Sequence, residues 1–165
     1  ECGWSSVSDN YGTAIVGTGD NGRHNVIDLT QEMKDAVNNA LTDKVPCILA
    51  TASPDGKPGV GFRGSMMAYD NSSLAYWERT FRRSAENVLA NPHVVILYRN
   101  PQTRTAWKFF GRAEVHTDGA VRDDVMNRVV QAELDRDPDR KGAAVVVRLD
   151  RIESMAGEIL MSVDE

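Results

Sequence analysis

The sequence has few cysteines and no long apolar run, and each shortage excludes a class of protein. Its two cysteines, Cys2 and Cys47, form neither a disulfide framework nor the paired spacing of a zinc site. The three histidines are scattered along the chain, and we predict no metal site. No apolar stretch approaches the ~20 residues of a membrane-spanning helix, and the polar start "ECGWSSVSDN" lacks the apolar core of a secretory signal. We therefore expect a cytoplasmic protein that does not bind a membrane.

The sequence also lacks the residue sets of the common hydrolases. It shows no Ser/His/Asp set and no paired carboxylates, which fits an enzyme whose chemistry is supplied by a cofactor. A GxGxxG spacing is present at Gly17, Gly19 and Gly22. The stretch "RHNVID" that follows does not start an amphipathic helix, which a dinucleotide site requires. We interpret these glycines as a flexible loop.

The chain is acidic, with 19 Lys and Arg against 24 Asp and Glu, but its cations are unevenly placed. Residues 62–115 contain eight cations and four acids, whereas the rest of the chain contains eleven cations and twenty acids. The acidic surroundings oppose binding of a long polyanion, so we expect no nucleic-acid partner. A confined basic region suits a small anionic ligand instead.

Hydrophobic patterns predict a mainly β (α+β) fold with a domain at residues 28–165, preceded by an irregular arm over residues 1–27. The turn signal "SPDG" predicts a hairpin formed by residues 46–53 and 58–69. The other predicted strands are 74–79, 93–99, 104–116 and one or two strands within 143–160. The predicted helices are 28–43, capped by Asp28 or Thr30, then 84–91 and 118–135. About six strands, mostly joined by hairpins, favour a small antiparallel barrel.

Three arginines lie within five positions, between a predicted strand and a short predicted helix. They are Arg79, Arg82 and Arg83, and the next residue, Ser84, is a plausible N-cap of that helix. Guanidinium groups so close repel one another unless an anion lies among them. An arginine binds phosphate through two parallel hydrogen bonds, and the amides at the helix start would add donors. The cluster therefore indicates a phosphate site.

A fourth arginine, Arg63, lies inside a strand of the neighbouring hairpin, where an arginine needs a partner. We expect it to reach the same corner. The alternative interpretation is that the arginines form solvent-exposed ion pairs with Glu78 and Glu86, which contribute little to stability.

The chain resembles a known family in the order of three stretches. "VPCILATASPDGKPGVGFRGSMM", "LAYWERTFRRSAENVLANPHVVILY" and "WKFFGRAEV" are similar to the pyridoxamine 5′-phosphate oxidase-like flavin-binding split barrels, over roughly residues 28 to 155. The resemblance implies a six-stranded antiparallel split β-barrel with flanking helices. It also implies a homodimer that holds flavin mononucleotide (FMN) at its interface.

The resemblance further implies positions for the cofactor. Arg63 would contact the FMN phosphate or the pyrimidine edge of the ring, and many members have a Lys where this chain has Ser84, so we assign that charge to Arg83 or Arg82. The full set implied to bind the cofactor is Arg63, Ser65, Met66, Met67, Tyr76, Trp77, Arg82, Arg83 and Ser84, with the partner's Trp107 and the partner's Lys108; Ser65, Met66 and Met67 would do so through their backbone, which would run along the flavin ring. The residues alone leave an alternative: the two methionines and the aromatic side chains, Phe109 and Phe110 included, could pack in the core or a dimer interface.

The function that the resemblance implies is an FMN-dependent oxidoreductase acting on a small organic substrate that the sequence does not identify. A strict pyridoxamine phosphate oxidase is not expected, because the vitamin-processing members end in a substrate-binding tail with a Trp and arginines, whereas this chain ends "EILMSVDE". The alternative is a non-catalytic stress or sensor protein that binds flavin, deazaflavin or haem.

Overall fold

The structure is a computed structural model that describes residues 26–163. The GxGxxG spacing and nearly all of the arm predicted over residues 1–27 lie outside the described residues. Of that arm, Val26 and Ile27 are described, and Ile27 is buried in the main core. No helix in the described part of the chain is long and apolar enough to cross a membrane.

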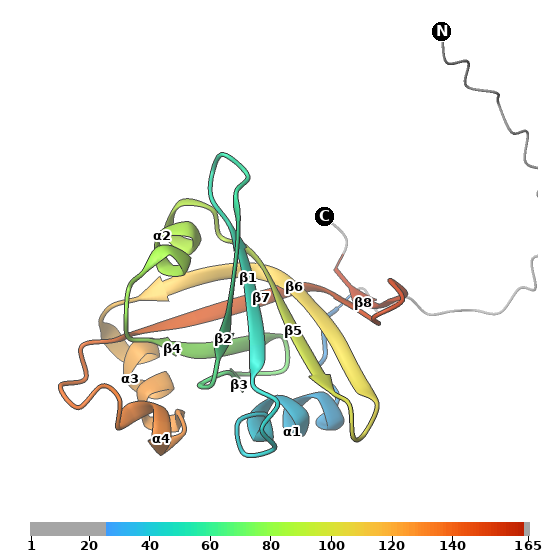
Figure 1. Cartoon of the computed structure of the whole chain (residues 1–165), viewed down its shortest axis with the longest axis horizontal. Coiled ribbons are helices and arrows are strands. Elements are labelled where there is room, and N and C mark those ends of the chain that lie inside the picture. The colour runs from blue at the N-terminus through green and yellow to red at the C-terminus, as the bar shows by residue number, and fades with distance from the viewer. Residues whose placement is uncertain (1–25, 164–165) are drawn as a thin grey trace, which may run out of the picture.

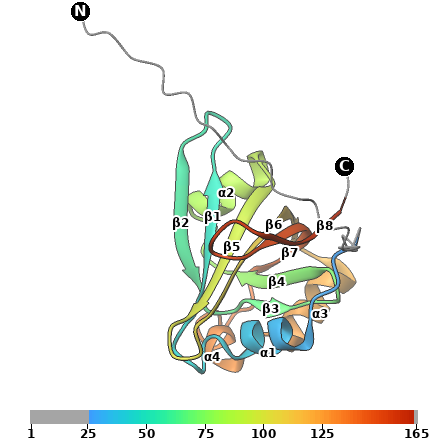
Figure 2. The same ribbon diagram turned by 90° about the vertical axis from the view of Figure 1, so that its right-hand side faces the viewer.

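A single antiparallel sheet organises the fold and curls into a half-barrel (Figures 1 and 2). Its strand order is β2-β1-β5-β6-β7-β4-β3, and β8 pairs with the far end of β7. The strands are β1 (Cys47–Ala52), β2 (Pro58–Arg63), β3 (Met67–Ala68), β4 (Ser73–Glu78), β5 (His93–Asn100), β6 (Thr105–His116), β7 (Ala143–Glu153) and β8 (Ile159–Ser162). The predicted α+β class and antiparallel barrel are confirmed.

The described residues form eight strands where the sequence predicted about six. The predicted strand 58–69 breaks after Arg63, and the chain resumes as β3, which pairs with β4 at the opposite edge of the sheet. Gly64 stands at the break because a Cβ there would lie 2.7 Å from a carboxylate oxygen of Glu133. The segment 143–160 supplies both β7 and most of β8.

In the described part of the chain four helices flank the sheet: α1 (Gln31–Asn39), α2 (Arg83–Ala90), α3 (Gly119–Arg128) and α4 (Gln131–Leu134). α1 and α2 lie towards opposite ends of the half-barrel in both views (Figures 1 and 2). The α1 cap is as predicted, because the Thr30 hydroxyl accepts a hydrogen bond from the Met33 amide at 3.2 Å. The predicted helix 118–135 is divided in two, since Val129 and Val130 have extended backbones.

The prediction that Ser84 caps α2 is wrong. Arg82 occupies the N-cap position with an extended backbone and no side-chain cap bond, so Ser84 lies inside the first turn. Its hydroxyl is thereby available to a neighbouring strand rather than to the helix amides.

Two apolar cores lie on the two faces of β4, all of whose residues are buried. Consecutive strand residues point to opposite faces, so Tyr76 joins the main core while Trp77 joins a second core. The second core packs β4 and β7 against α3 and α4, through Val125, Val129 and Leu134 among others. This double burial fixes the strand that carries Glu78 to the site described below.

Candidate functional site

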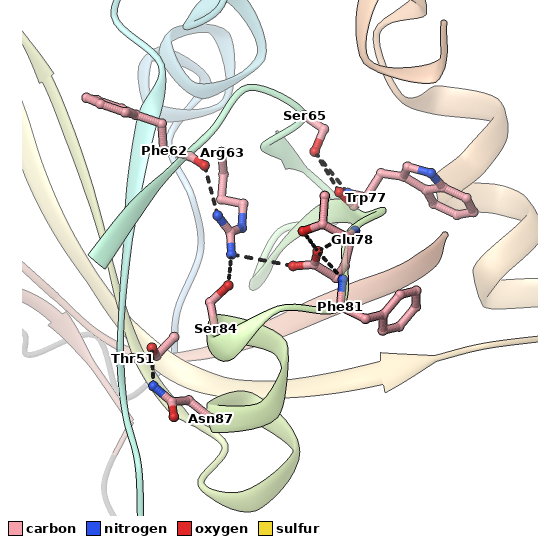
Figure 3. Close-up of polar contacts among 10 residues, drawn as sticks. Thr51, Phe62, Arg63, Ser65, Trp77, Glu78, Phe81, Ser84 and Asn87 are labelled. Atoms are coloured by element: carbon pink, nitrogen blue, oxygen red, sulfur yellow. Dashed lines mark hydrogen bonds and ion pairs between the residues drawn. The ribbon is translucent and has the colours of Figure 1, made fainter. Parts of the chain in front are cut away.

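Arg63, at the end of β2, is the centre of a partly buried polar cluster (Figure 3). One terminal nitrogen, Nη2, donates to the Ser84 hydroxyl at 2.5 Å and lies 3.4 Å from a carboxylate oxygen of Glu78. The other, Nη1, donates to the carbonyl of Phe62 at 2.9 Å. The Arg63 side chain is 15% exposed. The predicted approach of Arg63 to the start of α2 is therefore confirmed.

Glu78 supplies the anion in this cluster. Its Oε1 accepts hydrogen bonds from the amide of Thr80 at 3.0 Å, the hydroxyl of Thr80 at 3.1 Å and the amide of Phe81 at 3.2 Å. Phe81 has a positive φ of 46°, and the turn that it forms brings its amide, like that of Thr80, to the carboxylate. Glu78 is 4% exposed. The sequence interpretation considered Glu78 only as a surface partner and missed this role.

Arg82 and Arg83 are exposed at the start of α2. Among the residues that the structure describes, neither has an ion-pair partner, so the interpretation of surface pairs with Glu78 and Glu86 is wrong for these two arginines. Arg79 is also exposed and lines a small pocket beside Arg63. The phosphate-binding role of Arg82 and Arg83 stays a prediction.

Tyr76 packs under the guanidinium of Arg63, whose Cζ lies 5.2 Å from the ring centroid. Its hydroxyl is buried, and within residues 26–163 neither this hydroxyl nor the buried Nε of Arg63 has a hydrogen-bond partner. Burial raises the pKa of the Tyr76 hydroxyl to about 12, and the positive charge of Arg63 opposes part of that rise. Two polar atoms at this corner thus remain unsatisfied within the chain.

We expect the substitution Tyr76→Phe to stabilise the cofactor-free protein by about 1 kcal/mol at pH 8, because it removes a buried unpaired hydroxyl. The pKa of Tyr76 is about 12 in the folded protein and 10.0 in an unfolded chain. Between these two values the unfolded tyrosine ionises and the folded one does not, so the free energy of unfolding falls as the pH rises from 10.0 to about 12. Y76F should remove this part of the alkaline loss, while Cys47, whose pKa burial raises to about 12, keeps its own part. Urea unfolding at pH 8 measures the gain in stability, and urea unfolding at pH 11 measures the alkaline loss. A Y76F protein that is less stable than the wild type at pH 8 would contradict the assignment of the hydroxyl as buried and unpaired.

Four other residues predicted near the flavin ring are enclosed by their own chain. The Ser65 hydroxyl accepts from the amide of Trp77 at 3.0 Å, and the indole nitrogen of Trp77 donates to Asp137 at 2.9 Å. Met66 lies in the main core and Met67 in the second, so packing explains these side chains. That the backbone of Ser65, Met66 and Met67 runs along a flavin ring stays a prediction.

The Trp107–Lys108 pair of β6 is divided between the two faces of the sheet. Trp107 packs in its own core, stacked on Tyr98 with ring centroids 5.7 Å apart, so it is not placed to cover a partner's cofactor. Lys108 lies on the outer face, 2.7 Å from Glu153. Phe109 is fully buried in the main core, which confirms the alternative that this side chain packs in the core.

Two hollows lie near these residues. The pocket beside Arg63 and Arg79 measures about 80 Å³, far below the ~300 Å³ at which small-molecule sites begin. A larger hollow of about 360 Å³ lies against β1, β5, β6 and β7, with Thr51 and Phe110 in its lining. Thr51 also accepts a hydrogen bond from Asn87 at 3.0 Å, which ties α2 to β1 and holds the arginine-bearing end of the helix in place. No group of potential metal ligands occurs within residues 26–163.

Comparison with known proteins identifies the fold's relatives. HupZ of Group A Streptococcus is 26% identical, with a TM-score of 0.64 over 79% of this chain and 98% of HupZ. A candidate pyridoxamine 5′-phosphate oxidase from Lactobacillus delbrueckii is 28% identical, with a TM-score of 0.62 over 79% of this chain and 97% of its own. A pyridoxamine 5′-phosphate oxidase-related, FMN-binding protein from Nostoc punctiforme shares the fold at 14% identity, with a TM-score of 0.58 over 71% and 76% of the two chains.

The curated proteins include no match to the chain. The family model described as pyridoxamine 5′-phosphate oxidase matches residues 33–155, which include the whole polar cluster around Arg63 and every strand up to β7. The chain therefore belongs to the pyridoxamine 5′-phosphate oxidase family.

Proposed function

We propose that the protein is an FMN-dependent oxidoreductase acting on a small organic substrate. The observation that carries the proposal is the convergence of Arg63 and Ser84 at the start of α2, beside Arg82 and Arg83, in a chain of this family. Guanidinium groups, a hydroxyl and a helix start are the donors that bind phosphate best. Nε of Arg63, which has no acceptor within the described residues, adds one further donor. Bound FMN would supply hydride or electron transfer, for which the protein provides binding and orientation.

The first experiment is identification of the ligand that purifies with the protein. We expect a yellow preparation with close to one flavin per chain, from which extraction and mass measurement recover FMN. A colourless protein that takes up no added FMN would sink the proposal. Recovery of deazaflavin or haem would instead favour one of the other planar cofactors.

We propose a homodimer as the second part of this function, because the pocket beside Arg63 is too small to enclose a flavin ring within one chain. The outer face of the sheet offers the surface. Val60 and Phe62 of β2 are 77% and 69% exposed, and their cross-strand neighbours continue the apolar face over β1, β5 and β6. These neighbours are Ile48, Ala50, Val95, Leu97 and Phe110.

The substitution Phe62→Lys is expected to convert the dimer to a monomer, because a charge buried in an apolar interface costs several kcal/mol. Leu89→Lys is the matched control, since Leu89 is 67% exposed on α2, away from this face. Light scattering after size-exclusion chromatography measures the mass of each variant. A wild-type monomer, or an F62K protein that still forms a dimer, would exclude this surface as the interface.

A non-catalytic flavin-binding protein is the second candidate. One observation favours it: the acidic and phenolic groups nearest the cluster, Glu78 and Tyr76, are both enclosed by their own chain and not placed to move a substrate proton. Turnover separates the two candidates. An oxidoreductase reduces its bound flavin with a nicotinamide donor and is reoxidised by a defined acceptor through many cycles, whereas a binding protein only retains the flavin.

A further inference from the structure

The donors around Glu78 form what we call the anion site: Nη2 of Arg63, the hydroxyl and amide of Thr80, and the amide of Phe81 (Figure 3). A guanidinium, a hydroxyl and successive backbone amides of a turn are the groups with which proteins bind phosphate and other oxyanions. In this chain their occupant is a carboxylate of the chain itself. Glu78 is buried there, and its carboxylate oxygens bind these donors.

The Glu78 carboxylate lies next to the predicted phosphate site. The same nitrogen, Nη2 of Arg63, donates to Ser84 at 2.5 Å and lies 3.4 Å from Glu78. A phosphate that accepted from Arg63 and Ser84 would therefore lie beside the carboxylate, and like charges a few ångströms apart in a partly buried place repel strongly. The Arg63–Glu78 pair is neutral as a whole, so Arg63 attracts an anion far less than an unpaired guanidinium would.

A second observation points to an external ligand at this place. Arg63 lines the small pocket at this corner, and within the described residues its buried Nε has no hydrogen-bond partner. Buried donors left unpaired are costly, and an incoming acceptor would satisfy them. The pocket at this corner also contains Arg79 and a second carboxylate, that of Glu133, which lies 3.5 Å from Arg136.

We propose that Glu78 is a specificity-determining residue that competes with the phosphate of the ligand for Arg63. The inference rests on the proposed function, because FMN is the phosphorylated ligand. In the free protein Glu78 holds Arg63 and keeps the corner folded. In the complex it lowers the affinity for phosphate and so reduces the preference for FMN over riboflavin, the same ring system without the phosphate.

Glu78→Gln tests the proposal, because glutamine keeps one oxygen for the amides of Thr80 and Phe81 and replaces the charged oxygen that faces Arg63 with a neutral group. In flavin-stripped protein we expect E78Q to bind FMN about tenfold more tightly or better, with riboflavin affinity unchanged within about twofold. The unfolding midpoint of the free variant should fall, since Arg63 loses its counter-charge. Glu86→Gln is the matched control, because it removes an exposed charge near the start of α2. It should alter neither the ratio of FMN to riboflavin affinity nor the unfolding midpoint.

Weaker FMN binding by E78Q, or an equal change for FMN and riboflavin, would overturn the inference and leave the proposed function standing. If neither wild type nor variant binds FMN, the proposed function fails and this inference fails with it. Should E78Q not fold, Arg63→Met and the double variant R63M/E78Q replace it, because loss of both charges leaves no unpaired ion. The double variant should bind FMN more tightly than R63M, and equal affinities would contradict the proposal.

Discussion

Replacing Arg82 and Arg83 together with alanine is expected to weaken FMN binding about 100-fold or more while leaving the free protein as stable as the wild type. Each charge-assisted hydrogen bond to phosphate contributes about 1.5–3 kcal/mol, and 1.4 kcal/mol corresponds to a factor of ten. Both side chains are exposed, and within the described residues neither forms an ion pair, so their loss leaves no buried group without its partner. Titration of flavin fluorescence gives the affinity, and urea unfolding gives the stability.

The control is the double variant R99A/R148A, which removes the same charge from two exposed arginines that lie on strands outside the cluster. It should bind FMN within about threefold of the wild type, the small change reflecting the long-range field alone. Unaltered FMN affinity in R82A/R83A would show that these arginines are solvated surface charges with no phosphate to hold.

The substitution Gly111→Ala is expected to lower the folding stability of the free protein by about 3 kcal/mol, the largest effect on folding that we predict for a single residue. Gly111 lies in β6 at the register shift opposite β7, where a Cβ would overlap the carbonyl oxygen of Arg148 and lie 3.0 Å from its carbonyl carbon. Both atoms belong to the backbone of the neighbouring strand, so relief requires the two longest strands to separate. Urea unfolding of the free protein measures the change.

Gly61→Ala is its matched control within the same sheet. The Cβ added there would lie 3.3 Å from Nη1 at the tip of the Arg63 side chain, and a side-chain tip gives way by a few tenths of an ångström more easily than a strand backbone does. Its cost should stay below about 1 kcal/mol. If G111A is no less stable than G61A, the close approach of β6 to β7 is not a constraint on the fold.

Local patterns in the sequence were sufficient to predict most elements of the fold. The cap at Thr30, the "SPDG" reversal with Gly56 at φ 81°, and the continuous apolar run of β5 each depend on residues close together in the chain. At the break after Arg63, by contrast, Gly64 packs against Glu133, which lies seventy positions from Arg63 in the chain. No local pattern contains that contact, so the predicted second arm of the hairpin was too long.

In the candidate site, too, one feature could be predicted from the sequence and another depends on residues far apart in the chain. That Arg63 would meet the start of α2 followed from the order of the strands, and it is confirmed. The pairing of Arg63 with Glu78 crosses from β2 to β4 and could not be predicted without the register of the sheet.

One signal in β6 was available in the sequence. Strand residues alternate between faces, so Trp107 and Phe109 had to point one way and Lys108 the other. Applied to "WKFFGRAEV", the alternation separates the two residues that the resemblance had placed together over a partner's cofactor. For Tyr76 and Trp77 the sequence gives no such alternation of apolar and polar residues, because both faces of β4 are buried.

The central claim is that the arginine-bearing corner of the half-barrel holds the phosphate of a flavin, and the most direct test compares two flavins on one protein. Flavin-stripped wild-type protein is titrated in parallel with FMN and with riboflavin at fixed salt concentration. We expect FMN to bind at least ~100-fold more tightly, because only FMN carries the phosphate that Arg82 and Arg83 would contact. Equal affinities for the two flavins would contradict it.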